Sequence, residues 1–470
     1  MQQLSAQDAS FIYSETPSAH MHVAMLGLYD QSTASAERVR FRDILGNIEQ
    51  RLHLAKCFRR KLVEVPGETD HPYWIEDRNF DLEFHVRHVA LPPPGDWTQF
   101  CRQAARLHSY PLDRTKPLWE LTVISGLHAI DGVPEGAFAL LLKVHHAAID
   151  GVSGAALTEV LHDLSATPGT IPPPQAPWHG EPEPAPFELM SRSALNNFMQ
   201  PMRAAEMLSR TIPAARRAAE RLRSRPVEPI GPVPRTRFNA RVTPHRVFDG
   251  RQYRLDDLRA IKQTVKGATI NDAVLTVVGG ALRKYLIDKG ELPNDSLIAM
   301  APINVRTADE KNTEGNKVAA MLASLCTHIE NPAERLAAVR DSTHKSKLFT
   351  SAIGARLMTD YNQFIPARVA ALAARVYSAA GMAERGTPSF NCVVTNVPGP
   401  QSPLYMSGAR LDRMFGMGPV SDGVGLIFPV FSYCGGITIS VCGCRETLPD
   451  AERLANDLDD SFEQLKRATA

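Results

Sequence analysis

Two adjacent histidines are the residues of this chain best suited to chemistry. His145 and His146 follow the apolar run Ala137–Val144, and Asp150 and Gly151 come shortly after them. Successive side chains of a strand point to opposite faces, so the two rings cannot both address one substrate while the strand stays regular. We therefore expect one histidine to be catalytic and the other to be structural.

A histidine at the end of a strand can act as a general base. An unperturbed pKa near 6.5 leaves the ring mostly neutral, yet basic, at physiological pH. Such a ring can accept a hydroxyl proton while the oxygen attacks a carbonyl, which typically contributes roughly 10²–10⁴-fold to the rate. The same residues also fit a structural role, because core histidines can be satisfied by hydrogen bonds and Asp-Gly is a common turn. The residues alone leave both interpretations open.

Two other chemistries fit the pattern less well. Adjacent histidines on a strand diverge and no third ligand is suggested, so we expect no zinc site. Gly151–Ala155 has the outline of a hydrolase nucleophile elbow, but its last position is alanine and the strand has already ended. Cys442 and Cys444 form a C-x-C without a second pair at zinc spacing, and we expect both to be small core residues.

Composition indicates a soluble protein with two domains. The chain has 470 residues, more than a single core usually holds. Its 52 basic and 51 acidic residues give a net charge of +1, which predicts no nucleic-acid partner. Seven cysteines predict no disulfide framework. With no secretory signal and no apolar stretch near roughly 20 residues, we expect a cytoplasmic protein.

Hydrophobic periodicity predicts an α/β protein. The predicted strands are His22–Tyr29, Phe84–Leu91, Leu118–Ile124, Ala137–Val144, Leu297–Ile303, Val318–Leu325, Cys392–Val397 and two runs between Leu426 and Val441. The predicted helices are Ala36–Leu52, Trp97–His108, Val152–Leu164, Leu255–Val265, Asn271–Asp288, Ala352–Ala380 and a last helix that begins near Pro449.

A long linker is expected to separate the two domains. Residues 167–186 contain eight prolines, which no core element tolerates, and a second proline cluster spans 226–234. We therefore predict domains at 1–166 and 237–470, joined by a linker at 167–236. The segment 190–225 is rich in arginine and has helical character. It fits either a basic amphipathic helix on an anionic membrane or lipid droplet, or a solvated linker helix packed on its own domains.

The histidine motif also resembles a known family. His145–Gly151 match the HHxxxDG motif of the chloramphenicol-acetyltransferase-like superfamily of CoA-dependent acyltransferases and condensation domains. Further segments resemble the bacterial wax ester synthase/acyl-CoA:diacylglycerol acyltransferase family, and together they extend over nearly the whole chain. These segments are Leu4–Phe11, Met21–Val23, Pro111–Arg114, Pro117–Glu120, Thr269–Asp272, Gly315–Asn316, Asn396–Pro400 and Phe431–Tyr433.

The resemblance implies a fold and an activity. It implies two chloramphenicol-acetyltransferase-like domains, with mixed sheets flanked by helices and an active-site channel between them. The implied reaction moves a long-chain acyl group from acyl-CoA to diacylglycerol, and to fatty alcohols to form wax esters. Acyl-CoA is then a co-substrate, and no metal or organic cofactor is expected. Peripheral association with a membrane or lipid droplet is expected only if the basic helix binds lipid, and the oligomeric state stays open.

The resemblance also implies roles for single residues. His146 is the expected general base, with His145 in a supporting role and Asp150 in an ion pair with an arginine, for which Arg306 is a candidate. Gly151 is expected to allow a tight turn beside the channel. No acyl-enzyme is implied, since the motif contains no nucleophilic serine or cysteine.

Two further sites have competing interpretations. Asn271 is a candidate donor to the developing oxyanion, although Thr-Ile-Asn-Asp is also typical of a capped helix start. Pro117, Leu118 and Trp119 would line the acyl channel by resemblance, but they also fit core packing at the entry to a strand.

Two other functions of the protein remain open: a condensation-type enzyme that uses a carrier-protein thioester, and a non-catalytic protein that binds lipid or coats droplets.

Overall fold

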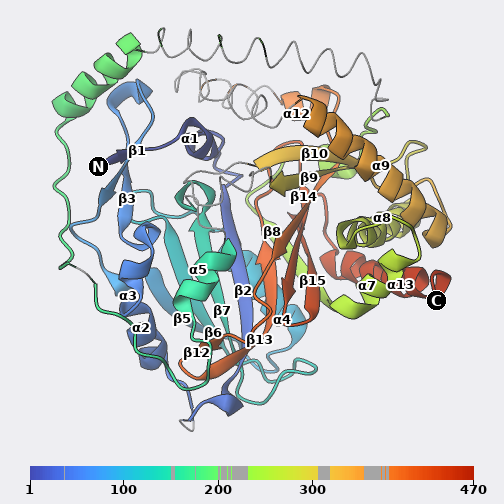
Figure 1. The fold of residues 1–470 in the computed structure, drawn as a ribbon, viewed down its shortest axis with the longest axis horizontal. Coiled ribbons are helices and arrows are strands. Elements are labelled where there is room, and N and C mark those ends of the chain that lie inside the picture. The colour runs from blue at the N-terminus through green and yellow to red at the C-terminus, as the bar shows by residue number, and fades with distance from the viewer. Residues whose placement is uncertain are drawn as a thin grey trace.

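Figure 1 shows the chain as a computed structural model with two sheets side by side and helices packed around them. The structure describes residues 1–35, 38–149, 154–174, 176–199, 231–304, 318–353 and 381–470, together with the single residues 202, 209, 213, 372 and 376. The predicted α/β class with mixed sheets flanked by helices is confirmed. Outside the described residues lie Asp150, Gly151, Arg306, Gly315–Asn316, most of 200–225 in the predicted segment 190–225, and most of the predicted helix 352–380.

The first sheet holds the strand that leads to the histidines. Its strand order is β12-β13-β2-β7-β6-β5. These strands are β12 (Tyr405–Met406), β13 (Ala409–Met417), β2 (His22–Asp30), β7 (Phe138–His145), β6 (Trp119–Ser125) and β5 (Val86–Ala90). Strands β5 and β6 are parallel and the other neighbours are antiparallel. The register places His22 opposite His145, so β2 begins beside the end of β7.

The second sheet has the strand order β10-β9-β11-β14-β15-β8. Its strands are β10 (Val318–Ser324), β9 (Ile298–Asn304), β11 (Cys392–Pro398), β14 (Leu426–Tyr433), β15 (Gly436–Cys444) and β8 (Arg246–Arg254). Strand β11 lies parallel to both of its neighbours, and the other pairs are antiparallel. A smaller sheet joins β1 (Gln2–Gln3), β4 (Tyr73–Glu76) and β3 (Arg60–Val63).

Sheet membership does not follow chain order. Strand β13 comes from the last quarter of the chain, yet it pairs with β2 in the first sheet. The hydroxyl of Tyr433 on β14 holds this crossing segment, accepting from the N–H of Leu404 at 2.8 Å and donating to the carbonyl of Leu411 at 3.0 Å. The predicted domain boundaries stay a prediction, but the first sheet is complete only with residues from both sides of the linker.

Helices cover the outer faces of the sheets. In the first half they are α1 (Ala6–Tyr13), α2 (Phe41–Glu49), α3 (Leu82–His85), α4 (Trp97–Ser109), α5 (Gly154–Leu161) and an unlabelled helix over residues 186–199. In the second half they are α7 (Leu255–Gln263), α8 (Ile270–Asp288), α9 (Pro332–Ile353), α12 (Met382–Arg385) and α13 (Ala451–Ala468). Within the described ranges, none of the helices is both long and apolar enough to cross a bilayer.

Most predicted elements are confirmed, with one correction and several omissions. The strand predicted at Phe84–Leu91 is wrong at its start, because Asp81 accepts from the N–H of Glu83 and caps a short helix, α3. Strand β5 therefore begins only at Val86. The sequence pattern also missed β8, β13 and α9, which have too little local periodicity to stand out.

Two apolar clusters form the interior of the first half, one on each face of its sheet. The cluster on one face includes Leu26 and Leu141 of the first sheet and also Phe248 of β8. The two halves of the chain therefore share a core beneath α4, which packs against β8. Residues of β7 therefore pack against residues from both halves of the chain.

Candidate active site

Strand β7 delivers the histidines because it is buried along its whole length. Its apolar run packs between the two clusters of the first half. Lys143 interrupts this run, with 1% of its surface exposed, and its ammonium lies 3.0 Å from the carboxylate of Glu120. It also donates to the carbonyls of Leu107 and Tyr110. A buried ammonium with these partners fixes the end of β7 against β6 and α4.

His146 begins the 3₁₀ turn that follows β7. Its backbone N–H donates to the carbonyl of Met21 at 2.8 Å, so the turn is fastened to the residue before β2. Its ring stacks on Phe11 of α1, with centroids 3.9 Å apart and an angle of 16° between the planes. Nδ1 is buried, while the residue as a whole is only partly buried.

The environment of His146 keeps its ring neutral. Burial lowers the pKa of His146 to about 4, opposed by the carbonyl of His146 itself and aided by the neighbouring ring of His145. Desolvation disfavours the charged form of an imidazole. At neutral pH the ring is therefore a neutral acceptor of a proton.

His145 is the last residue of β7 and the N-cap of the turn that begins at His146, so its surroundings differ from those of His146. Its Nδ1 accepts from the N–H of Ala147 at 3.1 Å, which closes the turn around His146. Because Nδ1 is the acceptor, the proton of a neutral ring sits on Nε2. That nitrogen lies 3.2 Å from Oε1 of Glu15. His145 thus links the turn that contains His146 to a carboxylate.

Glu15 is the centre of a partly buried polar cluster just after α1. Its Oε1 accepts from the N–H of Met21 at 2.8 Å, and its Oε2 accepts from Arg114 at 2.7 and 3.2 Å. Burial alone would raise the pKa of Glu15, but His145, Met21 and Arg114 lower it to about 2. The carboxylate is therefore charged at neutral pH. The carbonyl of Met21 also accepts from the N–H of His146. Glu15 therefore contacts His145 directly and holds His146 through Met21.

The structure does not place all of the predicted site residues around His146. Pro117, Leu118 and Trp119 are buried, and the indole of Trp119 donates to the carbonyl of Phe58 at 2.9 Å. Trp119 also stacks on His85, with centroids 4.6 Å apart. These contacts are those of core packing at a strand entry, while a role in an acyl channel stays a prediction.

Asn271 is the second residue of α8, and it is not the cap of that helix. Thr269 is the N-cap, and its side chain and the carboxylate of Asp272 form a reciprocal capping box. Asp272 is buried and also accepts from the hydroxyl of Thr343 at 2.6 Å. Among the described residues, the side chain of Asn271 has no hydrogen-bond partner, and a role as donor to an oxyanion stays a prediction.

Sequence reasoning missed Glu15 and Phe11, whose side chains contact the rings of His145 and His146, respectively. Both lie in or beside α1, about 130 residues before the motif in the chain. The segment Leu4–Phe11 could have pointed to them, because it is one of the segments that resemble the family, although the resemblance assigns no role to its residues. Arg114, in another such segment, is the cation that pairs with Glu15 at 2.7 Å.

Comparison with known proteins identifies the family. The model of the wax ester synthase/diacylglycerol acyltransferase catalytic domain matches residues 4–274, and the model of the WS/DGAT C-terminal domain matches residues 314–466. The chain belongs to the wax ester synthase/diacylglycerol acyltransferase family. As a member of this family it is an acyltransferase, as the motif around His146 had suggested.

Two mycobacterial relatives cover almost the whole chain. A putative diacylglycerol O-acyltransferase of Mycobacterium tuberculosis strain CDC 1551 is 32% identical over 469 residues, which are 99% of this chain and 90% of the relative. A probable diacylglycerol O-acyltransferase of strain H37Rv is 31% identical over 473 residues, which are 100% of this chain and 99% of the relative.

Solved structures confirm the predicted fold. The wax ester synthase/diacylglycerol acyltransferase of Marinobacter aquaeolei VT8 matches with a TM-score of 0.68 and 26% identity, covering 100% of both chains. The trichothecene 15-O-acetyltransferase of Fusarium sporotrichioides shares the fold at a TM-score of 0.59 and 12% identity, covering 100% of this chain and 95% of its own. Both comparisons support the chloramphenicol-acetyltransferase-like architecture of the wax ester synthase/diacylglycerol acyltransferase family.

Proposed function

We propose that this acyltransferase moves a long-chain acyl group from acyl-CoA to the free hydroxyl of diacylglycerol, with His146 as the general base. The observation that carries the proposal is the state of that ring. It is held at the end of a buried strand, stacked on Phe11 and neutral because burial lowers its pKa to about 4. A neutral imidazole in a fixed orientation is what proton abstraction from an alcohol requires.

In the proposed reaction, the acceptor oxygen attacks the thioester directly. With Nδ1 of His146 buried, Nε2 takes the hydroxyl proton while the oxygen forms its bond to the acyl carbon. The tetrahedral intermediate then expels the CoA thiolate, which receives the proton from the imidazolium. No acyl-enzyme is proposed, since His145–Gly151 contain neither serine nor cysteine. Asn271, whose amide has no partner among the described residues, is proposed to donate to the oxyanion.

The proposed acceptors follow from the names of the relatives. Two mycobacterial relatives are named as diacylglycerol O-acyltransferases, and the Marinobacter protein is named as both a wax ester synthase and a diacylglycerol acyltransferase. Diacylglycerol is therefore the proposed main acceptor and a fatty alcohol the second. The long-chain acyl group comes from acyl-CoA, and no metal or organic cofactor takes part in the proposal.

One experiment separates the proposed function from its alternatives. Purified enzyme is incubated with radiolabelled palmitoyl-CoA and either diacylglycerol or hexadecanol, and the esters are separated by thin-layer chromatography. Triacylglycerol formed without any carrier protein supports the proposal. Turnover that requires a carrier-protein thioester would replace it with condensation chemistry. Tight binding of palmitoyl-CoA without turnover of any acceptor would instead indicate a lipid-binding protein.

We also propose that the enzyme reaches its lipid acceptor by peripheral contact with a membrane or lipid inclusion. The helix over residues 186–199 exposes large apolar side chains, with Phe187 81%, Met190 54%, Leu195 65% and Phe198 78% exposed. Leu189 of the same helix is buried in a small cluster with Val65 and Tyr73. An amphipathic helix that is anchored on one side and apolar on the other suits a lipid surface.

The helix can be tested by liposome flotation. A variant with Phe187→Ser and Phe198→Ser is expected to lose most of its association with anionic liposomes and to keep its folding transition, since both side chains are largely exposed. A Leu164→Ser variant, which removes an exposed leucine outside this helix, is the matched control. Equal flotation of both variants would remove this helix from the lipid contact.

A further inference from the structure

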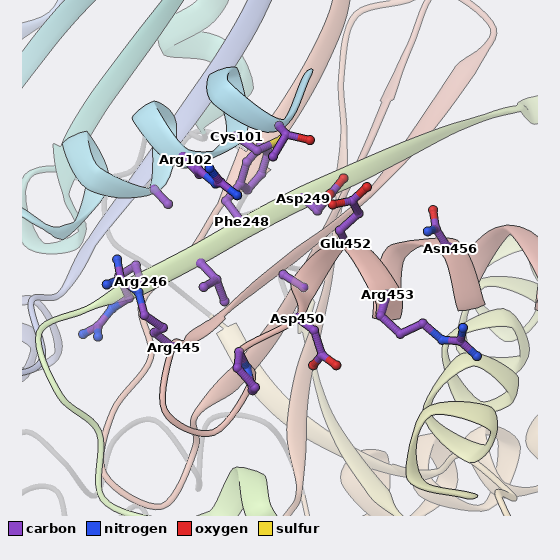
Figure 2. A pocket seen from close by; sticks show the side chains of 15 residues that line it. Cys101, Arg102, Arg246, Phe248, Asp249, Arg445, Asp450, Glu452, Arg453 and Asn456 are labelled. Carbon is purple, nitrogen blue, oxygen red and sulfur yellow. The ribbon is translucent and has the colours of Figure 1, made fainter. Parts of the chain in front are cut away.

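A cavity of about 720 Å³ lies between α4, β8 and the start of α13 (Figure 2), and neither His145 nor His146 lines it. Arginines from three separate segments line it: Arg102 on α4, Arg246 at the start of β8 and Arg445 just after β15. Figure 2 shows Arg246 and Arg445 next to each other on one side of the cavity. The cavity is therefore a place where both halves of the chain contribute positive charge.

Most acidic residues of the cavity are engaged elsewhere. Asp249 lies 2.5 Å from the guanidinium of Arg251, and Asp450 lies 2.6 Å from the ammonium of Lys289. Glu452 is the remaining carboxylate of the lining and forms no ion pair with a described residue. Of the four arginines that line the cavity, Arg102, Arg246 and Arg445 therefore outnumber the one carboxylate that could neutralise them.

Arg102 and Arg445 are exposed, and their side chains form no ion pair within the described part of the chain. Arg453 also lines the cavity, but it pairs with Asp288 and with Asp457. Arg102 and Arg445 are thus the two lining arginines whose guanidinium groups are available to a ligand from solvent.

Arg246 is buried, with 7% of its surface exposed. Its guanidinium donates to three carbonyls, those of Thr243, His245 and Ser18. Among described residues no carboxylate lies within ion-pair distance of it, and burial lowers its pKa. A buried charge that has hydrogen bonds but no counter-ion is costly, and a bound anion would compensate it.

A short segment connects the cavity to the active site. The carbonyl of Ser18 lies 2.5 Å from the guanidinium of Arg246, and the carbonyl of Met21 lies 2.8 Å from the N–H of His146. The two carbonyls are three residues apart, so at most about 11 Å of extended chain separates them. An anion in this cavity is therefore within reach of a long, flexible ligand that reacts at His146.

We propose that this cavity binds the phosphate groups of the acyl-CoA donor, with Arg102 and Arg445 as the main contacts and Arg246 as a buried positive charge behind them. CoA carries its phosphates at one end of the pantetheine arm and its thioester at the other. Guanidinium groups bind phosphates with charge-assisted, often bidentate hydrogen bonds. The inference rests on the proposed function, because it takes acyl-CoA as the donor.

The test compares two thioesters in steady-state kinetics. Arg102→Ala and Arg445→Ala are each expected to raise the KM for palmitoyl-CoA about tenfold and to leave kcat nearly unchanged, since one charge-assisted hydrogen bond is worth about 1.5 kcal/mol. With palmitoyl-pantetheine, which has no phosphate, the KM should not change. Arg106→Ala is the matched control, because Arg106 is exposed on the same helix and bonds to Tyr110. A KM for palmitoyl-CoA equal to that of the control would overturn the proposal.

Binding measurements keep this proposal separate from the proposed function. Calorimetry with adenosine 3′,5′-bisphosphate, and with inorganic phosphate in a second arm, needs no turnover. Binding of the bisphosphate that both arginine substitutions weaken supports the cavity even in an enzyme that forms no ester. Binding of both anions that is equal in wild type and variants overturns it, whatever the catalytic assay shows.

Discussion

The pH dependence of the reaction tests the state assigned to His146. With a pKa of about 4, the ring is about 99% neutral at pH 6. An unperturbed imidazole would be only about one quarter neutral at that pH, and the rate would fall about fourfold between pH 7.5 and pH 6. We therefore expect kcat, with palmitoyl-CoA and diacylglycerol both saturating, to stay level from pH 8 to pH 5.5 and to fall only on approach to pH 4.

The assay follows CoA release from palmitoyl-CoA with saturating diacylglycerol in buffers of constant ionic strength. Enzyme held at each pH and then returned to pH 7.5 gives the control for irreversible loss. A fourfold decrease at pH 6 that is fully reversible would show a base with an ordinary pKa and would refute the argument from burial.

The same pKa values set the direction in which stability changes with pH. His146 and His162 each have a pKa lowered to about 4, so both are neutral in the folded protein down to that pH. In the unfolded chain they take up protons below about pH 6.5. Stability therefore decreases as the pH falls from 6.5 to 4, by up to about 3 kcal/mol for each ring. Chemical denaturation at pH 7.5 and pH 5 measures this decrease.

Three substitutions test the surroundings of the base. Glu15→Gln should lower the free energy of unfolding by up to about 3 kcal/mol at pH 7, because the pKa of Glu15 is lowered from 4.5 to about 2. In urea titrations, the difference in stability between the variant and the wild type should vanish as the pH falls from 4.5 to 2. Asn271→Ala should lower kcat about 10²–10³-fold without a change in Tm, since Thr269 and Asp272 form the cap; a normal kcat would exclude it as the oxyanion donor. Tyr433→Phe should lower the free energy of unfolding by about 1–3 kcal/mol by leaving the Leu404 N–H without its acceptor, and an unchanged value would show that the crossing strand is held without this hydroxyl.

The sequence predicted the parts of the site that are local in the chain. An apolar run that ends in two histidines is a local pattern, and β7 and the turn at His146 have the expected places. The division of roles between His145 and His146 stays a prediction, because His146 lies in the turn after the strand, where strand alternation no longer applies. Cys442 and Cys444 are buried in a core cluster, as their type and spacing indicated.

The sequence could not predict contacts that depend on the tertiary fold. Glu15 reaches His145 only because α1 packs against the turn after β7, and no periodicity encodes that distance along the chain. Strand β13 joins the first sheet by pairing with β2, which local pattern cannot reveal either. Arg246 and Arg445 are unremarkable charges in the sequence, and only the packing of β8 and α4 places them in one cavity.

Replacement of His146 tests the central claim most directly. In a palmitoyl-CoA and diacylglycerol assay, His146→Ala is expected to lower kcat at least about 100-fold, as the loss of a general base typically does. Its melting temperature and its binding of palmitoyl-CoA should stay close to those of an exposed control variant, His128→Ala. A folded His146→Ala enzyme that makes triacylglycerol within a few fold of the wild-type rate would contradict the account.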